Sequence, residues 1–160
     1  MPYLIDGDVK ITETAAIMQY IAKKYRPSLL GMNAAEVGRI SMLLDKVHTL
    51  KMKATGPCYG SGDAGAIMAE CKPLLEKILE CMGDSEWIAG SSITWLDFYF
   101  AELVDMLNAV SDETIYQEYP KTKAYWERFI TLPNLAEAWT DDTKLMKRPF
   151  NNTQAKLLNI

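Results

Sequence analysis

SITWLDFYFAELVDMLNAV, residues Ser92–Val110, is the segment that decides the fold of this chain. Thr94 is a favourable N-cap residue, and Asp97 stands three positions later, where a carboxylate reaches back to the N–H group of the cap. This spacing predicts a capping box with Asp in place of the usual Glu. The apolar residues that follow cover nearly the whole helix circumference: Leu96, Phe98, Tyr99, Phe100, Leu103, Val104, Met106 and Leu107. A helix that is apolar nearly all round is buried, so the segment is predicted to be the central helix.

The composition predicts an ordinary globular protein without a nucleic-acid partner. The chain has 160 residues, of which 49% are hydrophobic and 24% charged, enough for one good core. A net charge of −4 and a pI near 5.1 are unlike the basic footprint of a nucleic-acid-binding domain. No apolar run is long enough to cross a bilayer, so no membrane insertion is expected.

Cysteine and histidine usage points to a reducing compartment and to no metal. Cys58, Cys71 and Cys81 form an odd set without a CxxC spacing, which is typical of reduced thiols. We therefore expect a cytoplasmic protein, since no signal peptide is seen either. His48 is the only histidine, which argues against a multi-histidine metal site.

The first 34 residues predict a hairpin, a helix and a linker. Tyr3–Ile5 and Val9–Ile11 are predicted strands around a tight turn at residues 6–8. Thr12 is then the expected cap of a helix over residues 13–25. Its predicted inner face is Ala16, Ile17, Tyr20 and Ile21. Pro27 stops this helix and Gly31 loosens the backbone after it, so residues 27–34 are interpreted as a linker.

From residue 35 onward the pattern is helical. One helix is expected to end before Gly56-Pro57, with a loop over residues 56–62, and a second is expected over residues 64–82. Pro73 is predicted to kink or interrupt the second helix. Residues 86–90 form an extended lead-in to the central helix. Further helices are expected from Pro120 and, briefly, over Pro133–Trp139.

Four motifs in this order resemble the glutathione transferases, most closely the mu-like branch. They are MPYLIDG at residues 1–7, KITETAAI at 10–17, WIAG at 87–90 and ITWLDF at 93–98. The resemblance implies a mainly α protein, with a glutathione-transferase-type C-terminal helical domain preceded by the C-terminal part (β-β-α) of a thioredoxin-like domain. The implied boundaries are a partial glutathione-binding domain over 1–26, a linker over 27–34 and an all-helical domain over 35–160.

The resemblance also implies a glutathione site at the start of the chain, with no metal or redox cofactor. Pro2 matches a cis-proline that precedes backbone pairing with the cysteinyl part of glutathione, beside Met1; a strand-edge proline is the plainer alternative. Glu13 and Thr14 match the residue pair that opens a helix at the ligand. There the helix N-terminus favours a glutathione carboxylate, the Thr14 hydroxyl adds a bond and Glu13 faces the α-amino group. The alternative is that these residues only cap the helix.

Tyr59 matches the tyrosine that mu-like enzymes place over the electrophile, where its hydroxyl donates a hydrogen bond to charge that develops on the substrate. Its alternative is an ordinary half-buried tyrosine. The family aspartate that reaches the neighbouring subunit's glutathione would lie ten residues earlier, where this chain has Thr49, with Asp45 one turn before. That departure puts dimer-shared ligand binding in question. Thr94 and Asp97 match the capping box of the family, a folding element rather than a site.

A β-α-β unit precedes these motifs in the family and carries the tyrosine or serine that holds glutathione as a thiolate. Tyr3 belongs to the third strand of that pattern and does not replace it. A thiol of pKa near 8.5 is mostly protonated at neutral pH, so conjugation by the chain as given is expected to be weak or absent. Three interpretations stay open: a fragment of a longer enzyme, a unit supplied by another polypeptide, or a non-catalytic structural or assembly subunit. The expected partners are glutathione and either a homodimer mate or a protein that covers the incomplete sheet.

Overall fold

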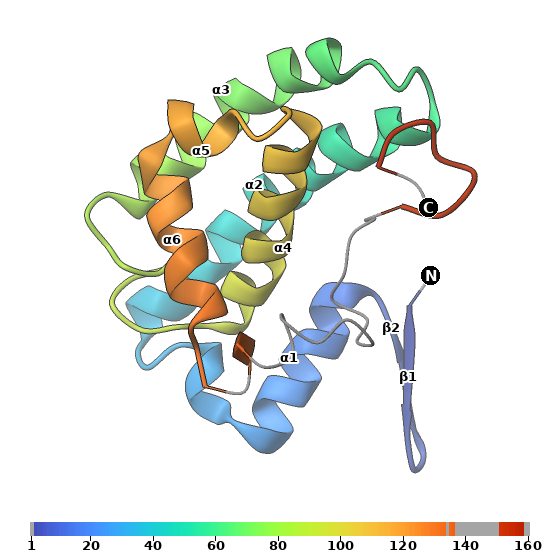
Figure 1. Ribbon diagram of the computed structural model, residues 1–160. Helices are drawn as coiled ribbons and strands as arrows, with labels where there is room; N and C mark the ends of the chain where they lie inside the picture. Colours follow the sequence, from blue (N-terminus) through green and yellow to red (C-terminus); the bar gives the residue numbers. More distant parts are fainter. Residues whose placement is uncertain (1, 134, 137–150, 159–160) are drawn as a thin grey trace.

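A computed structural model describes residues 2–133, 135–136 and 151–158 of the chain (Figure 1). It begins with a hairpin of β1 (Tyr3–Asp6) and β2 (Val9–Thr12), followed by α1 (Thr14–Tyr25) and the short 3-10 helix η1 (Pro27–Leu30). The helices after it are α2 (Ala34–Tyr59), α3 (Ala64–Met82), α4 (Trp95–Val110), α5 (Ile115–Glu118) and α6 (Pro120–Ile130). The mainly α fold class is therefore confirmed.

The hairpin is antiparallel and joined by the two-residue turn Gly7-Asp8, since Asp6 pairs directly with Val9. Gly7 has φ +60°, a left-handed conformation that glycine adopts at little cost. The Tyr20 hydroxyl of α1 donates to Asp6 at 2.9 Å, and the Lys24 ammonium also pairs with Asp6. These side chains fasten the hairpin to α1, which lies between it and the helical bundle in Figure 1.

Helix α4 is the centre of the bundle, as its sequence predicts. It contacts α1, α2, α3, α5 and α6. Twelve of its residues are buried, among them Leu96, Phe100 and Leu103. The predicted capping box is present: the Asp97 carboxylate accepts from the Thr94 N–H at 2.7 Å and from the Thr94 hydroxyl at 2.8 Å. The same carboxylate accepts from the Ile88 N–H at 2.8 Å and the Tyr125 hydroxyl at 2.9 Å.

The expected end of α2 before Gly56-Pro57 is wrong. The helix runs through both residues to Tyr59. Ala54 and Cys58 are fully buried on the same face, so core packing holds the last turn in helical form despite the missing Pro57 donor. The loop expected over residues 56–62 shrinks to the residues between Tyr59 and the next N-cap, Asp63. Pro73 likewise does not interrupt α3, which is continuous over Ala64–Met82.

The predicted inner face of α1 is wrong in part. Ala15, Met18 and Ala22 pack against the core, whereas Ile21 is 42% exposed and Ala16 is exposed. The helix carries apolar residues on more than one side, so periodicity alone selects the wrong set. Thr12 belongs to β2, and the N-cap is Glu13.

Three smaller differences concern short segments. The predicted linker contains η1, and α5 was not expected from the sequence. Leu135 and Ala136 are helical, but the rest of the helix expected up to Trp139 lies outside the described residues. The extended lead-in expected over residues 86–90 is wrong. The segment is a tight turn with Ile88 and Ala89 at its tip, where Trp87 and Gly90 form an isolated antiparallel bridge and exchange backbone hydrogen bonds of 3.1 and 3.2 Å.

Candidate functional site

The hairpin brings three of the predicted glutathione contacts together at one of its ends. Tyr3 pairs with Thr12, so Pro2 and Glu13 continue the two strands at the same end of the ladder. Thr14 is the first residue of α1, immediately beyond. All three are exposed. Met1, predicted as a fourth contact, lies outside the described residues.

Glu13 has a backbone conformation that residues other than glycine rarely adopt, with φ 70° and ψ 124°. Its carbonyl accepts from the Ile17 N–H at 3.0 Å and so begins α1, while its side chain makes no capping bond. A strained residue of this kind costs roughly 1–3 kcal/mol and such residues gather at binding sites. The sequence gives no sign of this strain, since Glu13 resembles an ordinary helix-start residue.

The first turn of α1 contains no acidic residue, and the carboxylate of its N-cap, Glu13, makes no capping bond to the helix N–H groups. By contrast, α2 has Glu36 and α4 has Asp97 in the first turn, and Asp63 caps α3. Free N–H groups and the helix dipole therefore leave α1 suited to an external carboxylate, next to the hydroxyl of Thr14.

Tyr59 lies elsewhere, as the last residue of α2, and is 41% exposed. Residues 151–158 lie against this helix end: the Lys156 N–H donates to the Cys58 carbonyl at 2.7 Å, and the Asn152 N–H lies 3.5 Å from the Tyr59 hydroxyl. The hydroxyl is thus at the surface, with a backbone donor as its neighbour. The structure gives no direct contact between Tyr59 and the Glu13 edge.

A polar cluster between α2 and α4 was missed by the sequence analysis. The Lys51 ammonium lies 2.5 Å from the Glu102 carboxylate and 4.5 Å from the centre of the Tyr99 ring. His48 Nδ1 is 3.4 Å from the Tyr99 hydroxyl. Partial burial raises the pKa of Tyr99. The residues that pair in this cluster lie fifty-one positions apart in the sequence, so no local spacing predicts it.

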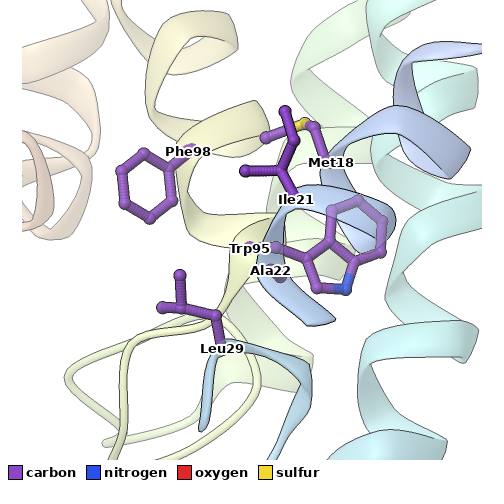
Figure 2. Close-up of a pocket in the computed structure, with 6 residues that line it drawn as sticks. All are labelled: Met18, Ile21, Ala22, Leu29, Trp95 and Phe98. Carbon is purple, nitrogen blue, oxygen red and sulfur yellow. The ribbon is translucent and has the colours of Figure 1, made fainter. Parts of the chain in front are cut away.

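An apolar hollow of about 180 Å³ opens where α1, η1 and α4 meet. Figure 2 shows its lining side chains, which come from all three elements: Met18, Ile21, Ala22, Leu29, Trp95 and Phe98. Trp95 and Ala22 are buried and form part of the core, whereas Ile21 stays exposed at the rim. The hollow offers apolar burial and almost no polar contact.

Thr49, the position of the family aspartate, lies with Asp45 in a second hollow between α2 and α3, of about 180 Å³. Lys46 and Lys77 line the same hollow. Among residues 2–133, 135–136 and 151–158, no group of three or more His, Cys, Asp or Glu side chains is placed to hold a metal ion. None of the helices in the described part of the chain is long and apolar enough to span a membrane.

Comparison with known proteins identifies the family. The model of the glutathione S-transferase N-terminal domain matches residues 1–23, and that of the C-terminal domain matches residues 66–141. Human glutathione S-transferase Mu 3 is 30% identical over 159 residues, which is 98% of this chain and 69% of that protein. The chain belongs to the glutathione S-transferase family. A second mu-class relative, the glutathione S-transferase class-mu 26 kDa isozyme 51 of Fasciola hepatica, is 30% identical over 95% of this chain and 69% of that protein. The chain is therefore mu-like.

The solved structures agree with this assignment at the level of the fold. The crystal structure of glutathione S-transferase Blo t 8 superimposes with a TM-score of 0.81 and covers 99% of this chain and 75% of that chain. At 23% identity this likeness speaks for the fold alone. The arrangement of a β-β-α piece before a helical bundle is therefore the glutathione S-transferase arrangement predicted from the motifs.

Proposed function

We propose that this glutathione S-transferase binds glutathione at the Pro2, Glu13 and Thr14 edge. The observation that carries the proposal is the strained backbone of Glu13, the N-cap of a helix whose first turn contains no acidic residue. The helix N–H groups and the Thr14 hydroxyl receive a carboxylate of the ligand, and the exposed Glu13 carboxylate faces its α-amino group. Pro2 and the end of β1 supply backbone groups for the cysteinyl part, where Met1 is a further proposed contact.

A titration of glutathione into the full chain, followed by amide NMR, tests this binding. Thr14→Ala removes the hydroxyl and is expected to weaken binding about tenfold, the usual effect of losing a hydrogen bond to a charged group. Thr14→Ser keeps the hydroxyl and serves as the matched control with near wild-type affinity. Absence of saturable shifts at millimolar glutathione would contradict the proposal.

The reaction we propose is conjugation of glutathione to electrophiles, with the Tyr59 hydroxyl donating to charge that develops on the substrate. Among the described residues we assign no side chain to hold the thiol as a thiolate, so conjugation by this chain alone is expected to be slow. Steady-state kinetics with an aryl halide check this. Tyr59→Phe should lower kcat and leave KM for glutathione unchanged. A kcat equal to that of the wild type would show that the Tyr59 hydroxyl takes no part in the reaction.

A second function, a non-catalytic structural or assembly subunit, is favoured by one observation. Tyr3 and Ile5 are 74% and 62% exposed on the outer face of the hairpin. A two-stranded sheet with an open apolar face is marginal in water and is normally covered. Sedimentation of the purified chain tests this role together with the homodimer that we propose: a well-behaved monomer without dye-accessible apolar surface would count against both.

A cytoplasmic setting is also proposed. It is supported by Cys58, Cys71 and Cys81, which are all free thiols in the structure. Microscopy of the tagged protein in its source cells checks the compartment.

A further inference from the structure

A further hollow, lined mainly by polar residues, lies at the C-terminal end of α1, away from the proposed glutathione edge at its N-terminal end. It measures about 310 Å³ and is formed where the chain after α1, residues 26–32, meets residues 87–93 before α4. Arg26, Ser28, Ser91 and Ser92 line it, with Trp87 beside them. Glu13 begins α1 and Arg26 follows its end, so the twelve-residue helix separates the two sites by about 18 Å.

The polar side chains of this hollow have no partner in the part of the chain that the structure describes. The Arg26 guanidinium forms no ion pair or hydrogen bond there, and neither do the hydroxyls of Ser28, Ser91 and Ser92. Arg26 shares this property with Lys10 and Lys23, whereas Lys24, Lys51, Lys53 and Lys72 each pair with a carboxylate. Arg26, Ser28 and Ser91 are exposed and Ser92 is half-buried, so a cation and three hydroxyl groups at one hollow are accessible to an external ligand.

The charges around the hollow are mixed, with two arginines and two glutamates close to it. The Arg128 guanidinium lies 5.8 Å from the centre of the Trp87 ring and adds positive potential. The Glu36 carboxylate accepts from the Met32 N–H at 2.6 Å, and Glu86 directly precedes Trp87, so both carboxylates offset part of this positive potential. Trp87 is only 7% exposed and forms a firm wall.

We propose that this hollow binds a phosphate group, either the free ion or a phosphate monoester. The planar guanidinium of Arg26 offers two parallel N–H donors that match two oxygens of a tetrahedral oxyanion. The serine hydroxyls donate to the remaining oxygens. The site is separate from glutathione binding and does not depend on the proposed conjugation of glutathione.

Titration of inorganic phosphate into the full chain, read by amide and indole N–H NMR, tests the proposal. We expect saturable shifts at Ser91, Ser92 and the Trp87 indole, with glutathione leaving them unchanged. Arg26→Gln is expected to weaken binding about tenfold or more, and Arg26→Lys to weaken it less, because lysine keeps the charge but loses the two parallel donors. Lys23→Gln, an equal charge change on α1 outside the hollow, is the control and should bind as the wild type does.

Phenyl phosphate in a parallel titration distinguishes the two sources of the ligand. Tighter binding than inorganic phosphate assigns the site to monoesters, and equal or weaker binding assigns it to the free ion. Both results support the site. Shifts that do not saturate, or that are equal in Arg26→Gln and the wild type, overturn it.

Discussion

Two residues carry opposite kinds of constraint in this protein, Glu13 at the surface and Asp97 in the core. Glu13 is exposed, yet its backbone has a costly positive φ that no core packing imposes. Asp97 is fully buried, and desolvation raises its pKa, although the hydrogen bonds that it accepts from Ile88, Thr94 and Tyr125 offset part of that effect. The first constraint suits a binding edge and the second suits a folding element.

Replacing Glu13 by glycine should stabilise the fold and weaken glutathione binding together. Glycine adopts φ 70° without steric cost, so the free energy of unfolding is expected to rise by up to about 1 kcal/mol. Glu13→Ala removes the same carboxylate but keeps the strain, and serves as the matched control with near wild-type stability. Urea unfolding and glutathione titration of both variants give the comparison; equal stability of the two variants would show that the angle costs nothing.

Asp97→Asn should be strongly destabilising although it is nearly isosteric. The new amide would present a donor to groups that are themselves donors, leaving buried N–H or O–H groups unpaired at about 1–3 kcal/mol each. We expect a loss of about 2–4 kcal/mol in chemical denaturation. Asp63→Asn, at the exposed cap of α3 whose carboxylate accepts only from the Ala66 N–H, keeps its capping oxygen and should be almost neutral. Similar losses in both variants would argue against the four-bond role of Asp97.

At the scale of elements, the hairpin depends on α1, since Lys24 and Tyr20 meet Asp6 across their contact. The hydrogen bond from Lys24, and then that from Tyr20, lowers the pKa of Asp6 below its ordinary value of 3.8. A carboxyl whose folded pKa is lowered stabilises the fold above its unfolded pKa, and that contribution disappears as pH falls through the folded pKa.

We therefore expect the hairpin to be fastened to α1 above about pH 4 and to loosen progressively below it. Carboxyl carbon NMR of Asp6 against pH measures this directly. Lys24→Gln should raise the pKa of Asp6 toward 3.8, while Lys10→Gln on β2 should leave it unchanged. An Asp6 pKa that is the same in Lys24→Gln and the wild type would show that the ion pair does not form in solution.

The sequence predicts elements well where one local rule acts alone, and fails where tertiary packing competes with it. The capping box at Thr94 and Asp97 and the hairpin turn at Gly7 need only neighbouring residues, and both were predicted. Proline normally ends a helix, but at Pro57 the burial of the neighbouring Cys58 keeps the last turn of α2 helical. The strain of Glu13 and the pairing of Lys51 with Glu102 depend on contacts or angles that no residue pattern contains.

At the scale of the whole molecule, the described part of the chain has one helical core with α4 inside it and a hairpin attached through α1. The three cysteines differ in their position relative to this core. Cys58 of α2 and Cys71 of α3 are buried, and burial raises the pKa of Cys71 to about 11. Cys81, near the end of α3, is exposed.

Alkylation of the native protein at neutral pH should therefore modify Cys81 alone, because the thiolate is the reactive form and the two buried thiols are both protonated and inaccessible. Mass spectrometry should find one adduct in the folded state and three after unfolding, with the buried pair reacting only as α2 and α3 separate. Cys81→Ser should show none while folded, and it also provides the background for conjugation assays, since an electrophile that modifies Cys81 would be mistaken for turnover. If Cys58 and Cys71 react as fast as Cys81, then α2 and α3 open independently of global unfolding, and the inference of a single cooperative core is wrong.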